Sequence, residues 1–201
     1  MTTISSDYLA QQKTLHQNKS YGKASVGYAP LVVDILKKTG FRSVADYGAG
    51  KCRLKTELEK YVNQFEYYPY DPAFPEYGKP TAADLVVCID VLEHIELDFL
   101  DDVLNQLKQM TSHVGLFSIH TGNAKKILSD GRNAHLIQQP ATWWLEKILP
   151  HFDVIQLTPV KKGFWVIVEK KGSSHSKSLL VNKMRFSFFN KLIQKIGFGK
   201  I

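Results

Sequence analysis

The stretch SVADYGAGKC, residues 43–52, constrains the fold of this chain more than any other segment. A short apolar run ends in Asp46, and two glycines, Gly48 and Gly50, follow with a single residue between them. Glycine permits backbone torsions and a close ligand approach that a Cβ atom would block. A helix-like pattern over 53–62 follows directly, and the first N–H groups of such a helix point toward whatever lies above the strand. The segment predicts a strand that turns sharply into a helix. It leaves open whether a nucleotide-type ligand or turn geometry alone requires the glycines.

Strand-like and helix-like segments alternate along the rest of the chain. We expect helices over 31–38, 53–62, 97–110 and 140–149, and strands over 43–47, 65–70, 84–89, 114–120, 154–158 and 164–169. The run DLVVCI over 84–89 is continuously apolar, as in a strand that is buried on both faces of a parallel sheet. The last two strands are separated by a connection short enough for a hairpin. This order predicts an α/β fold, a Rossmann-like three-layer sandwich whose mostly parallel sheet ends in an antiparallel hairpin.

Composition places the chain among ordinary globular proteins. It has 201 residues, of which 44% are hydrophobic and 22% charged, which fits one domain plus an extension. Its two cysteines, Cys52 and Cys88, form no disulfide framework and no paired metal-ligand spacing. The N-terminus lacks a basic region followed by an apolar core, and no stretch approaches the ~20 apolar residues of a membrane span. We therefore expect a cytoplasmic protein.

The net charge of +7 is concentrated at the C-terminus. Residues 170–201 hold eight basic residues and no acidic ones, so the remaining 18 basic and 19 acidic residues leave residues 1–169 at −1. A neutral body disfavours a long nucleic-acid substrate and argues against nucleic acid as a partner.

Polar side chains stand where the predicted parallel strands end. Asp46, Asp71, Asp90 and His120 each follow or close such a strand. Ligands of open α/β sheets bind at this edge, and Asp71 lies 25 residues after Asp46, near the offset at which a carboxylate takes ribose hydroxyls. The alternative is that Asp71 merely starts an Asp-Pro turn.

These motifs together resemble the class I S-adenosylmethionine-dependent methyltransferases over roughly residues 25–170. The resemblance rests on the Asp-x-Gly-x-Gly turn, the acid after the second strand, the segment DVLEH over 90–94 and the terminal hairpin. It implies S-adenosylmethionine as the cofactor. The backbone of 48–50 would approach its methionine portion, Asp71 would accept from its ribose, and Asp90 and Val91 would line its floor. The implied cofactor-binding residues are Asp46, Gly48, Gly50, Asp71, Asp90 and Val91.

The sequence departs from the family pattern in two places. Cys52 stands where the family motif has its third glycine. The connection over 73–83 is too short for a full helix–strand unit, so the fold is expected to be shortened around strand three. The adenine contacts that this unit would supply can only be placed near 80–84.

Three histidines are candidate catalytic bases for an acceptor hydroxyl. They are His94, His120 and His135, and an imidazole can hold or release a proton near neutral pH. The alternative for each is a satisfied structural histidine.

Asp90, Glu93 and His94 form a candidate metal site. If a helix begins near Asp90, their i, i+3, i+4 spacing places them on one face, and His120 or His135 would complete a divalent cation site, for instance for Mg²⁺. This group is similar to those of the metal-dependent 2′-O-methyltransferases of small-RNA 3′ ends and of ubiquinone-pathway O-methyltransferases. The alternative is that Glu93 and His94 cap the helix and orient a loop.

The segment DGRNAH over 130–135 is the candidate acceptor-binding loop. Asp130, Arg132 and Asn133 offer an acid, a guanidinium and an amide, and Arg132 could hold a phosphate or carboxylate through two hydrogen bonds. Trp143 could stack on a sugar or a base. A solvated polar turn is the alternative.

The chain divides into an N-terminal cover segment, 1–27, a methyltransferase domain, 28–170, and a basic tail, 171–201. The first segment is polar and either covers a ligand cleft or frays. The tail reads as a flexible linker followed by a basic amphipathic helix. That helix suits an anionic membrane surface, docking on its own domain or on another copy, or contact with nucleic acid.

We expect an S-adenosylmethionine-dependent methyltransferase that methylates an oxygen of a small-molecule or sugar/glycan-type acceptor. The alternatives are a non-catalytic S-adenosylmethionine-binding scaffold subunit and an RNA 2′-O-methyltransferase. A dinucleotide oxidoreductase is disfavoured because the third glycine of the nicotinamide fingerprint is absent.

Overall fold

A computed structural model describes residues 2–171. The α-helices are α1 (Ser6–Gln17), α2 (Ala24–Thr39), α3 (Arg53–Leu58), α4 (Leu100–Met110) and α5 (Ala141–Ile148). The strands are β1 (Ser43–Tyr47), β2 (Glu66–Tyr70), β3 (Ala83–Ile89), β4 (Thr111–His120), β5 (Phe152–Val160) and β6 (Gly163–Lys170). Short 3-10 helices are η1 (Pro75–Tyr77), η2 (Leu92–His94) and η3 (Leu97–Phe99). The predicted amphipathic helix of the tail lies outside the described residues.

The six strands form one sheet in the order β2-β1-β3-β4-β6-β5. Strands β1 to β4 pair in parallel, whereas β6 runs antiparallel to β4 and forms a hairpin with β5. The carboxyl ends of the parallel strands β1 to β4 therefore lie side by side along one border of the sheet, across the strand direction. The predicted α/β architecture with a terminal antiparallel hairpin is confirmed.

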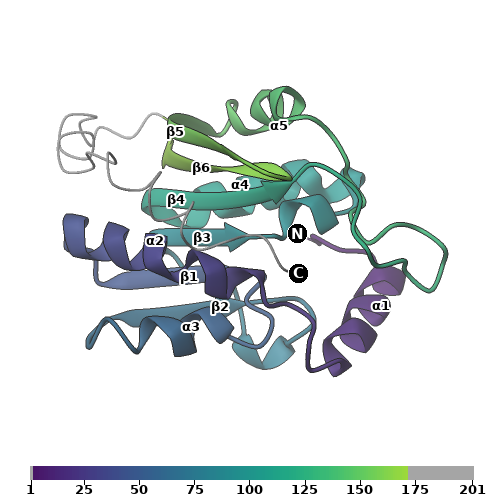
Figure 1. Ribbon diagram of the computed structural model, residues 1–201, viewed down its shortest axis with the longest axis horizontal. Coiled ribbons are helices and arrows are strands. Elements are labelled where there is room, and N and C mark those ends of the chain that lie inside the picture. Colours follow the sequence, from purple (N-terminus) through teal and green to yellow (C-terminus); the bar gives the residue numbers. More distant parts are fainter. Residues whose placement is uncertain (1, 172–201) are drawn as a thin grey trace.

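Helices cover both faces of the sheet and make it the middle of three layers (Figure 1). On one face, Ile35 of α2 and Leu54 of α3 are fully buried against β1, β3 and β4. On the other face, Leu104 of α4 and Trp144 of α5 pack with equally buried side chains of the same strands. The continuous apolar pattern of β3 follows from this double burial.

Helix α2 begins at Ala24, whereas the sequence predicted a helix that Pro30 opens. Pro30 lies inside the helix and leaves the carbonyl of Val26 without its usual donor, but Val26 is exposed, where water can satisfy that oxygen. The predicted end is correct: Gly40 adopts a left-handed conformation, φ 76°, and its N–H bonds to the carbonyl of Leu36. Helix α3 ends at Leu58 and continues only as turns, so the predicted helix over 53–62 was too long.

The connection between β2 and β3 holds only the 3-10 helix η1 among its described elements. The fold is shortened at this point, as predicted, and β2 is an edge strand of the sheet. β5 is the other edge strand.

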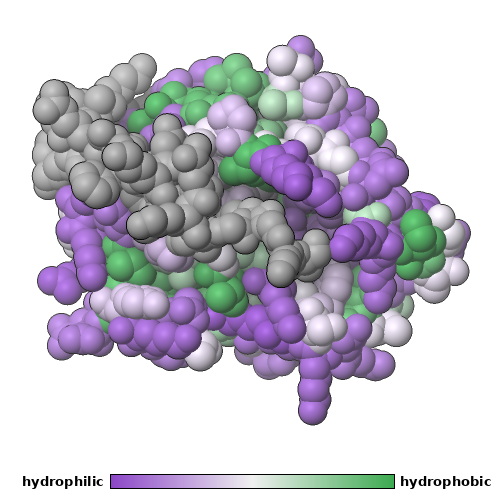
Figure 2. All heavy atoms as spheres, in the orientation of Figure 1, coloured by the Kyte–Doolittle hydropathy of each residue, from purple (hydrophilic) through white to green (hydrophobic). Residues whose placement is uncertain are grey.

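The molecular surface is mostly hydrophilic on the face shown in Figure 2, with hydrophobic residues in small separate groups. Within residues 2–171, the exposed large hydrophobic residues are Val26, Tyr61, Leu97, Ile127 and Leu149. Among residues 2–171, no helix combines the length and the apolar character needed to cross a bilayer.

Candidate functional site

The glycine turn after β1 is fastened to the end of β2. The N–H groups of Gly48 and Ala49 donate to the carbonyl of Tyr70, at 2.8 and 3.1 Å. Gly48 needs to be glycine for two reasons: its φ is 76°, and a Cβ atom there would lie 2.4 Å from Cγ2 of Val91. The turn therefore places Val91, a predicted floor residue, directly against the glycine motif.

Asp71 closes the turn from β2. Its Oδ2 accepts from the N–H of Gly50 at 2.9 Å, and its Oδ1 accepts from the N–H of Ala73 at 2.9 Å. Burial raises the pKa of Asp71, while these two N–H donors oppose the rise. Each carboxylate oxygen keeps further lone-pair capacity, so Asp71 can accept additional hydrogen bonds from a ligand.

Asp46 is buried beneath the turn rather than along its rim. It is 2% exposed, and the hydroxyl of Tyr67 in β2 donates to its Oδ2. Burial raises the pKa of Asp46 to about 7, and the Tyr67 hydrogen bond opposes this. The contacts described for this side chain support the β1–β2 pair below the glycine turn.

Cys52 replaces the third glycine of the family motif and keeps a glycine-like backbone. Its φ is 52°, one of two non-glycine residues with positive φ in the described chain; Asp90, with φ 58°, is the other. Both residues follow parallel strands at the same edge of the sheet. Such conformations cost free energy and cluster at functional sites.

Asp90, His94 and His135 come together at this edge. Each offers one ligand atom, and these atoms lie within 4.8 Å of one another. The condition for a shared helix face, a helix that begins near Asp90, is not met, because a residue with φ 58° cannot begin a right-handed helix and the 3-10 helix η2 follows. The group forms instead because the loop after β4 brings His135 beside His94, with their ring centroids 4.8 Å apart.

Backbone carbonyls hold the rings of His94 and His135. Nδ1 of His94 lies 2.7 Å from the carbonyl of Ala134, and Nδ1 of His135 lies 2.6 Å from that of Gly122. A carbonyl can only accept, so both Nδ1 atoms carry the proton and both Nε2 atoms keep a lone pair. This arrangement is typical of metal-ligating histidines.

Glu93 is not one of the three grouped ligands, although the sequence placed it in the metal site. Its side chain is fully buried, and its Oε1 accepts from the backbone N–H of His120 at 2.6 Å. Burial, followed by the nearby charge of Asp90, raises the pKa of Glu93 well above its usual range. Through this hydrogen bond, Glu93 links the turn after β3 to the end of β4.

His120 stands at the end of β4, with its ring centroid 4.6 Å from that of His135. Both the N–H and the carbonyl oxygen of Gly122 lie 3.1 Å from its Nδ1, so these contacts do not select one tautomer of His120. Burial lowers the pKa of His120 and that of His94. Both imidazoles are therefore biased toward the neutral form that a general base requires.

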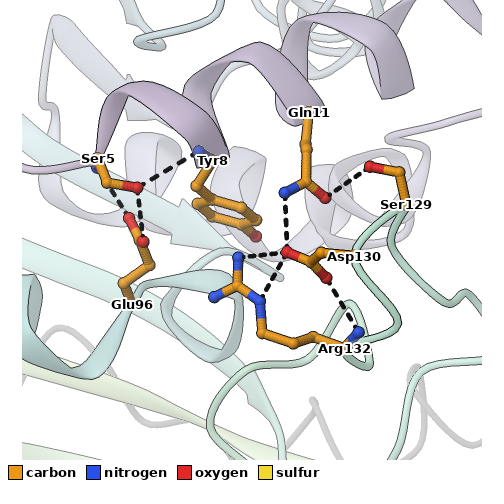
Figure 3. A network of polar contacts seen from close by, with 7 residues as sticks. All are labelled: Ser5, Tyr8, Gln11, Glu96, Ser129, Asp130 and Arg132. Atoms are coloured by element: carbon orange, nitrogen blue, oxygen red, sulfur yellow. Dashed lines mark hydrogen bonds and ion pairs between the residues drawn. The ribbon is translucent and has the colours of Figure 1, made fainter.

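The predicted acceptor loop is fastened to helix α1 (Figure 3). Arg132 pairs with Asp130 through Nε and Nη2, at 2.8 and 2.7 Å, and Gln11 of α1 donates to the same carboxylate at 2.8 Å. The Arg132 guanidinium holds the pKa of Asp130 below its usual range and lies 5.5 Å from the ring centroid of Tyr8.

The side chain of Asn133 forms hydrogen bonds with the backbone of its own loop. Its Oδ1 accepts from the N–H groups of Ala124 and His135, at 2.9 and 3.0 Å, and its Nδ2 donates to the carbonyl of Ala124. Asn133 thereby positions His135. Trp143 lies on α5, edge-on to Trp144 and 5.5 Å below the ammonium of Lys147, among contacts separate from the histidine group.

Sequence reasoning named residues 1–27 as a segment that could cover the cleft, but it did not identify the residues through which α1 and the following loop contact the site. Ser5 donates twice to Glu96 and caps α1, which fixes the helix beside the acceptor loop at the carboxyl ends of the parallel strands (Figure 1). Tyr21 is brought near Asp90 and Asp71, and burial raises its pKa to about 12. The sequence signal was weak: Tyr8 and Leu15 are the buried residues of an otherwise polar helix.

Comparison by sequence finds no match, either to a protein-family model or to a curated protein. Solved structures do match. A 1,6-didemethyltoxoflavin-N1-methyltransferase from Burkholderia thailandensis, with bound S-adenosylhomocysteine, is 14% identical over 85% of this chain and 92% of its own, with a TM-score of 0.59. The mitomycin 7-O-methyltransferase MmcR is 13% identical over 82% of this chain, with a TM-score of 0.60.

The methyltransferase domain of bacterial CtHen1-C is 14% identical over 74% of this chain and 99% of its own, with a TM-score of 0.55. Other matches are longer proteins: the chain spans 60% of the length of MmcR and 64% of an O-methyltransferase family protein from Burkholderia thailandensis. What these structures share with the chain is the sheet and its covering helices. The chain has the fold of the class I S-adenosylmethionine-dependent methyltransferases.

Proposed function

We propose that this chain transfers a methyl group from S-adenosylmethionine to an oxygen of a small-molecule or sugar/glycan-type acceptor. One observation carries the proposal: a glycine turn bonded to a buried acid, Asp71, lies at the same sheet edge as a group of three histidines. The first part suits a nucleoside donor and the second suits proton removal from a hydroxyl. Matching structures with bound S-adenosylhomocysteine support the choice of donor.

The proposed chemistry asks little of the protein beyond positioning. The sulfonium donor is already electrophilic, so the chain must align the acceptor oxygen with the methyl group and accept its proton. His94 presents an Nε2 lone pair, and burial lowers the pKa of its imidazole, which favours the neutral form. His135 presents the same atom to the group. Either nitrogen could take the hydroxyl proton.

The same residues fit a divalent cation. One carboxylate oxygen of Asp90 and the Nε2 atoms of His94 and His135 would hold it, and the held Nδ1 atoms would fix both rings. A bound cation would lower the pKa of an acceptor hydroxyl. Two imidazoles with one carboxylate favour a transition metal such as Mn²⁺ over the Mg²⁺ expected from the sequence, since Mg²⁺ prefers oxygen ligands.

Two measurements test the function. Isothermal titration with S-adenosylhomocysteine should show binding that Asp71→Ala weakens strongly, with Asp98→Ala, an exposed acid, as the matched control. Incubation with labelled S-adenosylmethionine and fractionated small-molecule or glycan extracts should then give a methylated product. Donor binding without turnover in any fraction would favour the scaffold alternative, and absence of donor binding would refute the proposal.

Metal dependence is tested separately. Metal content measured after equilibration with Mn²⁺ should be about one ion per chain, and His135→Ala should lose it while His151→Ala, remote from the group, should not. Full activity in excess chelator, together with no bound metal, would remove the metal from the proposal.

An RNA 2′-O-methyltransferase is the second candidate. The grouping of an acid with two histidines favours it, because the segment over 90–94 resembles that of the metal-dependent 2′-O-methyltransferases of small-RNA 3′ ends. The test uses a short RNA with a free 3′ end: methylation of the terminal 2′-hydroxyl removes the vicinal diol and makes the end resistant to periodate. Periodate sensitivity after incubation would exclude this candidate.

The basic tail, 171–201, is proposed to contact an anionic membrane surface. Its eight uncompensated basic residues over 170–201 support this. Co-sedimentation with anionic liposomes should be lost when residues 172–201 are deleted, and equal behaviour of the two proteins would end the proposal.

A further inference from the structure

His16, near the end of α1, reaches across to the glycine turn. Its Nε2 lies 4.0 Å from Oδ2 of Asp71, and its Cε1 lies 3.2 Å from where a Cβ atom of Gly50 would be. The side chain is only 12% exposed. A residue from the N-terminal helix therefore lies beside the glycine turn that the proposed donor approaches.

The position of His16 is fixed from two sides. The segment just after α1 is tied to the start of α3, because Lys51 donates to the carbonyl of Asn18 and Arg53 donates to that of Lys19. The imidazole itself lies edge-on between Tyr21 and Phe74, at centroid distances of 5.1 and 4.9 Å. The ring is consequently held in one orientation.

The hydrogen-bonding capacity of the ring is unused. Nδ1 is buried and has no hydrogen-bond partner among the described residues. Burial lowers the pKa of His16, which favours the neutral imidazole with one N–H donor and one acceptor on the ring.

The distance to Asp71 has a specific meaning. At 4.0 Å, Nε2 and Oδ2 are too far apart for a direct hydrogen bond. One hydroxyl oxygen placed about 2.8 Å from each atom would bridge them, and a hydroxyl can donate to the carboxylate while it accepts from the imidazole. A ribose offers such hydroxyls, and the two N–H groups that already bond Asp71 leave it lone pairs for them.

We infer that His16 is a donor-positioning residue, which binds a ribose hydroxyl of the nucleoside donor jointly with Asp71. The inference rests on the proposed function, because it assumes a ribose-containing donor above the glycine turn. Helix α1 then contributes a residue to the binding site of the methyl donor. Because α1 also contacts the acceptor loop, binding of the methyl donor and the position of that loop depend on the same helix.

The test compares binding of S-adenosylhomocysteine with that of its 2′-deoxy and 3′-deoxy analogues by isothermal titration. Four proteins are used. They are the wild type, His16→Phe, which keeps a ring without nitrogen atoms, His16→Asn, which keeps a hydrogen-bond donor, and Lys13→Ala, which changes an exposed residue of the same helix. Thermal unfolding is measured for each, so that affinities are compared only between folded proteins.

We expect His16→Phe to weaken binding of S-adenosylhomocysteine about tenfold, the size of one hydrogen bond, and Lys13→Ala to leave it unchanged. The wild type should discriminate against one of the two deoxy analogues, His16→Phe should lose that discrimination, and His16→Asn should regain part of it. A purely structural role would weaken all ligands equally.

Three outcomes overturn the inference. The first is binding of S-adenosylhomocysteine to His16→Phe within twofold of the wild type. The second is equal discrimination against the deoxy analogues in both proteins. In either case the proposed function stands, because the wild type binds the donor product. If the wild type itself binds no S-adenosylhomocysteine, the proposed function fails and the inference fails with it.

Discussion

The backbone N–H of His120 donates a 2.6 Å hydrogen bond to Oε1 of Glu93, which joins the turn after β3 to the end of β4. Glu93 is fully buried, so its removal would leave a cavity and an unpaired N–H. We expect Glu93→Ala to lower the free energy of unfolding by about 2–4 kcal/mol. Glu93→Gln keeps an acceptor and should stay within about 1 kcal/mol of the wild type. Urea denaturation measures both, and equal losses in the two variants would contradict the bracing role of the hydrogen bond.

The buried carboxyl group of Asp46 should make stability depend on pH. Its pKa of about 7 exceeds the usual value of 3.8 for this side chain, so the folded protein binds this proton more tightly than the unfolded chain. The stabilisation is complete below pH ~4 and is lost as the pH rises through about 7. Relative to Asp46→Asn, the wild type should lose up to about 4 kcal/mol between pH 4 and 8, at about 1.4 kcal/mol per pKa unit.

Chemical denaturation across this pH range checks the prediction. Asp98→Asn, which alters an exposed acid, is the control and should follow the wild type. A wild type and an Asp46→Asn variant with parallel pH profiles would show that Asp46 is ionised in the folded state.

Substitutions of Cys52 test how much the left-handed backbone conformation after the glycine turn affects stability. Glycine adopts φ 52° without strain, so Cys52→Gly should change the free energy of unfolding by less than about 1 kcal/mol. A β-branched residue is strained there, so Cys52→Val should cost about 1–2 kcal/mol and should weaken donor binding. Thermal unfolding and titration with S-adenosylhomocysteine give both quantities. A Cys52→Val variant as stable as the wild type would mean that the turn relaxes easily.

The contact between Gln11 and Asp130 should govern how firmly α1 is held. The bond joins residues 119 positions apart, and few others attach this helix to the acceptor loop. Asp130→Ala should increase hydrogen exchange over residues 6–17 while the exchange of β3 and β4 stays unchanged. Lys13→Ala, on the exposed side of α1, is the control. Unchanged exchange in Asp130→Ala would show that the helix is held by its other contacts, the packing of Tyr8 and Leu15 and the hydrogen bonds from Ser5 to Glu96.

The succession of strands and helices along the chain and the glycine turn were predictable because they depend on local signals. Apolar runs such as that of β3 and the glycine at position 48 act through their own neighbours in sequence. The docking of α1 was not predictable. Ser5 bonds to Glu96 across 91 positions, and no periodicity in either segment records that pairing.

The sequence predicted which residues form the candidate site, but it did not predict how the backbone brings them together. Asp90 and His94 were expected to share a helix face, and they meet instead through a left-handed residue and a 3-10 turn. His135 joins them because its loop returns over the end of β3, where the carbonyl of Ala134 accepts from His94. Spacing along one segment cannot report where a distant loop returns.

The two outer strands of the sheet each contain one proline, Pro69 in β2 and Pro159 in β5. The connection after β2 holds no further strand, so β2 is an edge strand in the described part of the chain, and an edge strand can pair with another molecule. A proline has no N–H to offer and interrupts the regular row of donors that an incoming strand needs. The two prolines therefore make both outer strands poor templates for aggregation. One of these strands, β2, leads directly into Asp71 of the candidate donor site.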